Sequence, residues 1–141
     1  MRVLLATYQS KTIFQTMVPL AWALRTAGHE VRVASQPSFA DAVTQAGLTA
    51  APVGRNHTTW RIVEAHAEQA EAERAGLPAP YDAAVTDPAA LDWQAMQDGY
   101  ASLLYRWHKP DNFPMVADLV DFARHWRPDL VIWEATTYAG A

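Results

Sequence analysis

Residues 1–35 read MRVLLATYQSKTIFQTMVPLAWALRTAGHEVRVAS, and this stretch decides the fold. It opens with an almost unbroken apolar run, Met1–Thr7, which is typical of a strand buried on both faces of a parallel sheet. A segment with apolar residues at helical spacing follows, and Gly28 is placed to end that helix. Its apolar positions are Phe14, Met17, Val18, Ala21, Trp22 and Leu24. A second strand, Glu30–Ala34, completes a β-α-β unit of about 30 residues.

The polar loop between the first strand and the helix, Tyr8–Thr12, is the first place to look for a function. It lies at the carboxyl end of the first strand and leads into a helix N-terminus. In open α/β sheets, ligands bind in the crevice at that end of the strands. Ser10, Lys11 and Thr12 are therefore candidate binding residues, and a solvated turn is the alternative interpretation.

Length and composition indicate one ordinary globular domain of 141 residues, with 50% hydrophobic and 18% charged residues. The net charge of −4 and the lack of a basic block argue against a nucleic-acid or membrane-surface partner. The chain has no cysteine, which excludes disulfides and thiolate metal sites and favours the reducing cytoplasm. No apolar stretch approaches the roughly 18 residues that span a bilayer.

The chain then continues the α/β pattern, with one interruption. We expect a helix over Phe39–Ala46, capped by Ser38, and then a strand over Leu48–Val53. Pro52 places that strand at an edge of the sheet, because proline cannot donate to a ladder of hydrogen bonds. Residues 55–90 are polar and proline-rich, which is typical of an insertion over the mouth of the domain or of a solvated helix.

The last third is predicted to hold two helices and a strand. The helices cover Leu91–Trp107 and Phe113–Trp126, with a break at Pro110. The apolar stripe of the second helix is Phe113, Val116, Leu119, Val120, Ala123 and Trp126. Leu130–Trp133 is expected as a fully buried strand, and Thr136–Ala141 as the opening of another helix. Since that helix would lack a partner, the sequence reads as the first half or more of a larger α/β domain.

Four segments together resemble a known family: MRVLLAT, VPLAWALRTAGHEVRVASQP, AGLTAAPVG and WRPDLVIWEATTYAGA. They are similar to the amino-terminal half of the GT-B glycosyltransferases that attach deoxysugars to polyketide and macrolide antibiotics, such as desosaminyl and mycaminosyl transferases. The similarity is strongest over 1–54 and 112–141 and weak over 55–90. It implies an α/β fold: a Rossmann-like parallel sheet with helices on both faces. Residues 1–141 would then be a partial acceptor-binding domain, the carboxy-terminal nucleotide-sugar domain being absent.

The resemblance also implies an activity and partners. A TDP-type nucleotide-diphosphate deoxysugar would donate its sugar to a hydrophobic polyketide aglycone in the cytoplasm. The donor would bind to the absent domain, so no cofactor is expected in this chain, and the fragment alone would be inactive. The close relatives imply a cytochrome-P450-like auxiliary protein as a partner. His57 and His66 have no third ligand nearby, so no metal site is expected.

Half of the catalytic pair that the resemblance implies is missing. An inverting sugar transfer needs a base for the acceptor hydroxyl, and a histidine backed by a carboxylate suits that role. In the family, this histidine lies six residues before the proline of the PLA motif, here Pro19, so Ile13 occupies its position. The family's carboxylate directly follows the fourth strand, where Glu134 matches it.

Three explanations of Ile13 remain open. In the first, another group takes the proton, for example Glu134, directly or through a water. In the second, the acceptor needs no strong base. In the third, the chain is a catalytically silent homologue. Such a homologue would be a binding or assembly module for a partner glycosyltransferase or auxiliary protein. A free-standing nucleotide binder is disfavoured, because no G-x-G-x-x-G motif or P-loop follows the first strand. The candidate acceptor-binding residues are Ser10, Lys11, Thr12, Ile13, Phe14, Trp60 and Thr136.

Overall fold

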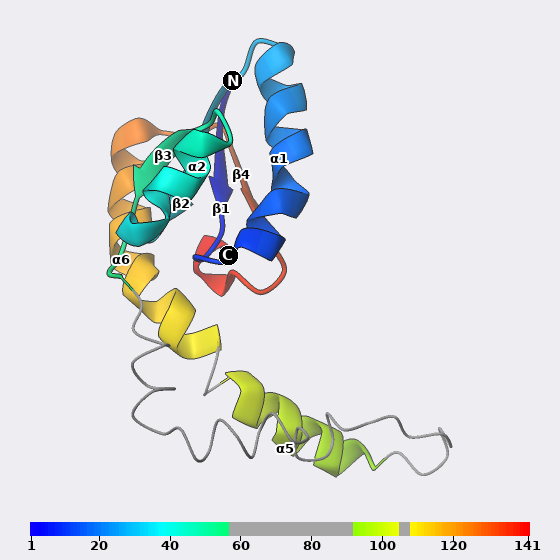
Figure 1. Cartoon of the computed structure of the whole chain (residues 1–141). Coiled ribbons are helices and arrows are strands. Elements are labelled where there is room, and N and C mark those ends of the chain that lie inside the picture. Colours follow the sequence, from blue (N-terminus) through cyan, green and yellow to red (C-terminus); the bar gives the residue numbers. More distant parts are fainter. Residues whose placement is uncertain (57–91, 105–107) are drawn as a thin grey trace. The chain divides into compact units, whose positions relative to one another are not determined.

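The computed structural model describes residues 1–56, 92–104 and 108–141, and its central feature is a parallel sheet (Figure 1). The chain divides into two units, 1–57 with 110–141 and 58–109, and the sheet belongs to the first. The four described strands run in the order β3-β2-β1-β4. They are β1 (Arg2–Ala6), β2 (Glu30–Ser35), β3 (Thr49–Pro52) and β4 (Leu130–Trp133). The expected parallel α/β sheet is thus confirmed, with β3 at one edge.

The register brings the carboxyl ends of the strands together. Ala6 of β1 pairs with Ala34 of β2 on one side and with Trp133 of β4 on the other. Ala34 pairs in turn with Ala51 of β3. The loops that follow the strands therefore leave the sheet at the same edge.

One face of the sheet is covered by α1 (Lys11–Thr26) and α2 (Ala40–Gln45), the latter preceded by the short 3-10 helix η1 (Pro37–Phe39). Alternate residues of β1 and β2 point to this face, as the period of two of a strand requires. The buried members of this core are Val3, Leu5, Phe14, Met17, Ala21, Val31, Val33, Phe39, Val43 and Leu48.

The opposite face is covered by α6 (Lys109–Trp126), so helices lie on both faces (Figure 1). Small side chains of the strands allow the helix to approach the sheet closely. The buried members of this second core are Leu4, Ala6, Ala34, Ala51, Val53, Met115, Leu119 and Trp126. Gly54 also lies against the helix: a Cβ there would be 2.7 Å from the Pro114 carbonyl oxygen.

Several helix boundaries differ from the sequence expectation. Ser38 lies within η1 and makes no cap; its hydroxyl donates to Gln9 Oε1 at 2.6 Å. Pro110 lies in the first turn of α6 rather than in a break, because a helix start tolerates the missing N–H. The expected helix after β4 is only a 3-10 turn, η4 (Tyr138–Gly140). Of the helix expected before α6, the structure describes α5 (Trp93–Leu103).

Burial also differs at three places. Trp22 is 53% exposed, and its indole N–H donates to the Ala46 carbonyl at 3.0 Å instead of filling the core. The expected stripe of α6 is wrong in part, since Phe113 is 67% exposed and Val116 and Val120 are also exposed. The fully buried strand expected at Leu130–Trp133 is half-exposed, because β4 is the second edge of the described sheet.

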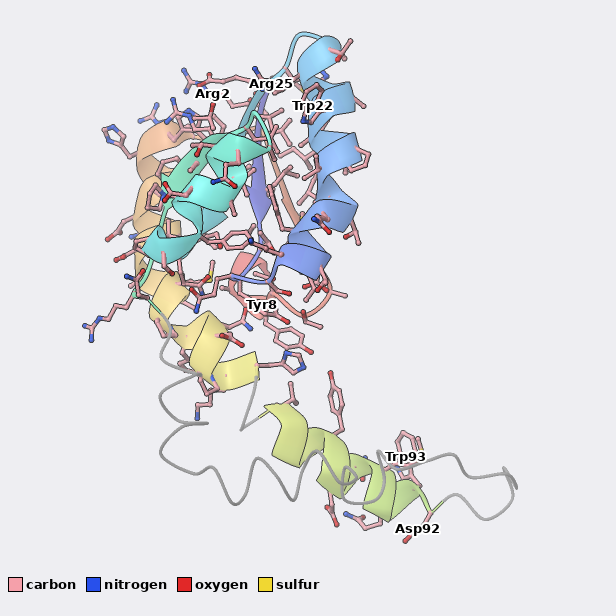
Figure 2. All side chains as sticks on the ribbon, viewed as in Figure 1. Arg2, Tyr8, Trp22, Arg25, Asp92 and Trp93 are labelled. Atoms are coloured by element: carbon pink, nitrogen blue, oxygen red, sulfur yellow. The ribbon has the colours of Figure 1, made fainter. Side chains whose placement is uncertain are left out.

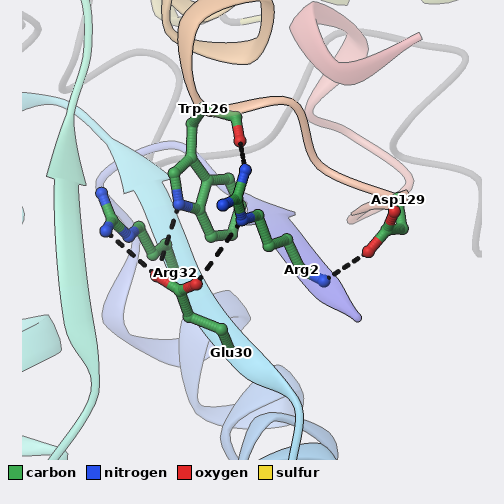
Figure 3. Close-up of polar contacts among 5 residues, drawn as sticks. All are labelled: Arg2, Glu30, Arg32, Trp126 and Asp129. Atoms are coloured by element: carbon green, nitrogen blue, oxygen red, sulfur yellow. Dashed lines mark hydrogen bonds and ion pairs between the residues drawn. The ribbon is translucent and has the colours of Figure 1, made fainter.

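A polar cluster fastens the end of α6 to the amino edge of the sheet (Figure 3). Arg2 donates from its backbone N–H to Asp129 at 2.7 Å and from its guanidinium to the Trp126 carbonyl at 2.8 Å. Glu30 accepts from the Trp126 indole at 3.3 Å and from Arg32 at 3.0 Å. Because the ion pairs are about half exposed, solvent screens them, and we assign this cluster an anchoring role.

Candidate functional site

Three loops and one helix start meet at the carboxyl edge of the sheet. Thr7–Ser10 follow β1, Gln36–Ser38 follow β2 and Glu134–Thr137 follow β4, while α6 begins beside them. Figure 2 shows Tyr8 at this edge and Arg2 at the opposite end of β1. The sheet changes its direction of growth between β1 and β4, since β2 and β3 lie on the other side of β1. Such a switch point is where open α/β sheets bind ligands.

Glu134 is held by the turn that follows it. Its Oε1 accepts a hydrogen bond from the backbone N–H of Thr136 at 2.9 Å. Its Oε2 accepts from the Thr136 hydroxyl and from the Thr137 hydroxyl, the latter at 3.4 Å. A carboxylate has about four acceptor positions, so these three contacts leave capacity for one more donor. The side chain is half-buried, at the edge where the sequence places it.

Tyr8, the second residue after β1, is a site residue that the sequence reasoning did not select. Its backbone N–H donates to the Thr137 hydroxyl at 3.3 Å, which joins the loops after β1 and β4. Burial raises the pKa of the Tyr8 phenol; the Thr136 side chain lowers it in part, and the Asp111 and Glu134 carboxylates raise it further. The phenol is therefore neutral at pH 7 and can donate a hydrogen bond. The sequence feature that could have identified Tyr8 is a residue with an aromatic hydroxyl just after a buried strand.

The expected binding residues of the loop after β1 lie at the start of α1. The Ser10 hydroxyl bonds to the Thr12 hydroxyl at 3.2 Å and makes no side-chain cap. Lys11 and Thr12 are exposed, and Ile13 is half-buried in the first helical turn. Phe14 is buried in the first core, with its ring edge against Phe39 at 5.4 Å between centroids.

The remaining aromatic candidates belong to the other unit or fall outside the described residues. Trp60 and Trp107 lie outside the described residues. Trp93 is 69% exposed on α5, in the other unit, and Tyr100 of the same helix is exposed as well.

The described residues contain neither a metal-binding group nor a membrane-spanning helix. In the ranges 1–56, 92–104 and 108–141, no group of three or more histidine, cysteine, aspartate or glutamate side chains could hold a metal ion. Within the same part of the chain, no helix has the length and apolar character needed to cross a membrane.

The parallel sheet with helices on both faces defines a Rossmann-like α/β domain, and comparison with known proteins identifies its family. Residues 22–141 match the family described as "Erythromycin biosynthesis protein CIII-like, N-terminal domain", and the chain belongs to this family. It is 49% identical to the erythronolide mycarosyltransferase of Saccharopolyspora erythraea and 50% identical to the 10-deoxymethynolide desosaminyltransferase of Streptomyces venezuelae. Both matches cover 100% of this chain but only 33% and 32% of the relatives, so the chain spans about a third of their length.

Solved structures agree with this assignment. The glycosyltransferase VinC, solved with dTDP, superposes with a TM-score of 0.74 at 38% identity, over 99% of this chain and 31% of VinC. The spinosyn forosaminyltransferase SpnP superposes with a TM-score of 0.61 at 35% identity, over 99% of this chain and 27% of SpnP. The resemblance to deoxysugar transferases and the GT-B type of fold expected from the sequence are thereby confirmed.

Proposed function

We propose that this chain is the acceptor-binding part of a deoxysugar transferase of antibiotic biosynthesis. The whole enzyme would transfer a deoxysugar from a nucleotide-diphosphate donor to a hydrophobic polyketide aglycone. The observation that carries the proposal is the bonded junction of the loops after β1 and β4, where Tyr8, Thr136 and Glu134 gather in a chain of this family. The names of the relatives, which include transferases to erythronolide and 10-deoxymethynolide, support a macrolide-like acceptor.

In this proposal Glu134 takes the proton of the acceptor hydroxyl. As the acceptor oxygen forms its bond to the anomeric carbon, its proton passes to the carboxylate and the nucleotide diphosphate leaves with the electron pair. Thr136 and Thr137 hold the carboxylate in place, and one acceptor position is left for the substrate. Tyr8, as a neutral phenol, donates a hydrogen bond that orients the acceptor.

Binding of the acceptor can be tested on the 141-residue chain itself. We expect a macrolide aglycone, titrated into the isotope-labelled chain, to shift the amide resonances of 8–12 and 136–138 in a saturable manner. The cluster around Arg2 and Arg32, at the opposite edge of the sheet, is the internal reference and should not respond. Shifts confined to that opposite edge, or no saturable shift, would contradict the proposal.

The role of Glu134 requires an assay of sugar transfer. In a chimera, residues 1–141 replace the matching third of the S. venezuelae desosaminyltransferase, to which they are 50% identical. Glu134→Gln should lower kcat by about 10²–10⁴, the usual effect of removing a general base, with little change in KM. Asp41→Asn, which makes the same change at an exposed position of α2, is the matched control and should leave kcat unchanged. An unchanged kcat in Glu134→Gln would exclude this carboxylate as the base.

A catalytically silent binding module is the second candidate function, and Ile13 is the observation that favours it. The apolar side chain lies half-buried in the first turn of α1 and cannot accept a proton. The same crevice would then hold a partner glycosyltransferase or a cytochrome-P450-like auxiliary protein. Ile13→His in the chimera separates the two functions: a large gain in kcat indicates a degenerate active site, and no gain indicates a base located elsewhere.

A further inference from the structure

Two buried amide side chains bond to the loops after β1 and β4, here called the crevice loops, and neither has a role in the function proposed above. Gln36 follows β2 and is 1% exposed, and Asn112 lies in the first turn of α6 and is 3% exposed. A buried amide that lacks partners is costly, so the bonds that these two groups make indicate why they are there.

Gln36 joins the loop after β1 to the start of α6. Its carbonyl oxygen accepts from the backbone N–H of Gln9 at 2.8 Å and from the Ser35 hydroxyl at 3.2 Å. Its amide nitrogen donates to the carbonyl oxygen of Asp111 at 2.9 Å. One side chain thereby connects three segments that are far apart in the sequence.

Asn112, the next residue after Asp111, makes the equivalent connection to the loop after β4. Its amide nitrogen donates to the Thr136 carbonyl at 3.0 Å. Its carbonyl oxygen accepts from the backbone N–H of Ala139, also at 3.0 Å. The first turn of α6 is therefore bonded to both crevice loops, through one amide on each side.

These bonds close into a ring. Gln36 connects Gln9 to Asp111. The neighbouring Asn112 connects the same helical turn to Thr136. The bond between the Thr137 hydroxyl and the Tyr8 N–H then leads back to the loop after β1. In a closed ring of hydrogen bonds, a change in the distance between two of the segments changes the distances between the others. The loops that carry Tyr8 and Glu134 are therefore connected both directly and through the first turn of α6.

We propose that Gln36 and Asn112 are a pair of positioning residues that hold the two crevice loops as one frame, whose spacing is set by the first turn of α6. Each position requires a side chain that donates and accepts at once, which an amide does and a carboxylate or an aliphatic chain does not. The effect of this frame on acceptor binding rests on the proposed function. The existence of the frame does not, because it is a property of the folded chain.

Amide hydrogen exchange in the 141-residue chain tests the frame without a ligand. Gln36→Glu keeps the acceptor for Gln9 but, once ionised, has no donor for the Asp111 carbonyl. We expect the Ala139 N–H, which makes no bond to Gln36, to exchange about tenfold faster than in the wild type above the pKa of the new carboxyl. Below that pKa the protonated carboxyl donates again. The ratio of the Ala139 exchange rate in the variant to that in the wild type should then return to one.

The matched control is Gln15→Glu, which makes the same change at an exposed position of α1 and should leave the ratio at one throughout. The reciprocal variant, Asn112→Asp, loses the donor to Thr136 and should accelerate exchange at Gln9. Acceleration confined to the amide bonded to the altered side chain, with the opposite loop unchanged, would overturn the proposal. Each of the two variants tests the proposal by itself, because each is read out at the loop bonded to the other amide. If one variant fails to fold, the other still decides the question.

Binding of a macrolide aglycone supplies the second readout. We expect Gln36→Glu to weaken binding about tenfold above the same pKa and to leave it unchanged below, a pH profile that a general loss of stability would not produce. The positioning role would be overturned if Gln36→Glu accelerated exchange at Ala139 but bound the aglycone with the affinity of the wild type at every pH. If the wild type binds no aglycone, the proposed function fails, whereas the exchange experiment still decides whether the frame exists.

Discussion

At the scale of single residues, the chemistry of the carboxyl edge depends on which hydrogen-bonding positions remain free. Glu134 uses both carboxylate oxygens to hold the turn of Thr136 and Thr137, and this makes it a fixed acceptor rather than a mobile surface charge. Tyr8 is tied to the same turn through its backbone, while its phenol stays protonated at neutral pH. The two groups thus offer one fixed acceptor and one donor in neighbouring loops.

The raised pKa of Tyr8 predicts a pH dependence of stability. Burial is the main cause, so the folded chain holds the phenolic proton more tightly than the unfolded chain. This stabilisation is fully present below the ordinary tyrosine pKa of 10.0 and is lost as the pH rises through the pKa of the folded state. In urea denaturation between about pH 8 and 11, Tyr8→Phe should therefore lose free energy of unfolding less steeply than the wild type.

The matched control for this experiment is Tyr100→Phe, which removes an exposed phenol of α5. It should follow the wild type. If Tyr8→Phe follows the wild type as closely, the Tyr8 phenol contributes nothing to the dependence on pH.

At the scale of elements, the position of α6 against the sheet determines the geometry of the site. The helix starts at the crevice and ends at the cluster of Arg2, Glu30 and Arg32, so it is fastened at both ends. Between these ends it packs against Gly54, two residues after β3, whose backbone N–H donates to Asp118 at 2.8 Å. Gly54 has a φ of +75°, which disfavours any residue with a Cβ.

Gly54→Ala should therefore lower the free energy of unfolding by about 2–4 kcal/mol. The new Cβ would lie 2.7 Å from the Pro114 carbonyl oxygen and 2.9 Å from Met115 Cα, and backbone atoms cannot yield as a flexible side chain can. Gly28→Ala is the control, because its φ is also positive, at +84°, but nothing lies within 4 Å of its Cβ. We expect that variant to cost about 1 kcal/mol in urea denaturation. Equal losses in the two variants would show that close packing at Gly54 is unimportant.

At the scale of the whole molecule, the chain consists of two units that are interleaved in sequence. Residues 58–109 form one unit, inserted between the two parts of the other. The described members of both hydrophobic cores come from 1–57 and 110–141. The first unit therefore contains the sheet, both of its helical layers and the candidate site.

Replacing 58–109 with a linker of about eight glycine and serine residues should leave the first unit folded. A short linker suffices, because Gly54 lies against Pro114 and the two ends of the first unit are thus close together. We expect the amide exchange protection of β1 and β2 to match that of the full chain. The same linker with Leu4→Asp, which places a charge in the second core, is the unfolded reference. If the amide exchange protection of the linker variant is as low as that of the unfolded reference, the inserted unit is required for folding.

The local patterns of the sequence were sufficient to predict much of the fold. The apolar run of β1, the helical spacing of α1 and the glycine at 28 each depend on neighbours within a few residues, so the β-α-β unit and the parallel sheet can be read from them. The choice of the carboxyl edge for the candidate site follows from the same pattern, as does the position of Glu134 directly after a strand. Family membership follows from the four characteristic segments.

Only the tertiary structure decided which side chains meet. Gln36 and Asp111 are 75 positions apart, and nothing near Gln36 in the sequence indicates that α6 will supply its partner. For the same reason Trp22 turns outward to the Ala46 carbonyl, although its spacing on α1 is that of a core residue. Burial and hydrogen bonding depend on elements distant in the chain, whereas periodicity reports only on the element itself. The sequence by itself thus determined the elements and the edge that carries the candidate site, and the packing of α6 decided how that edge is held together.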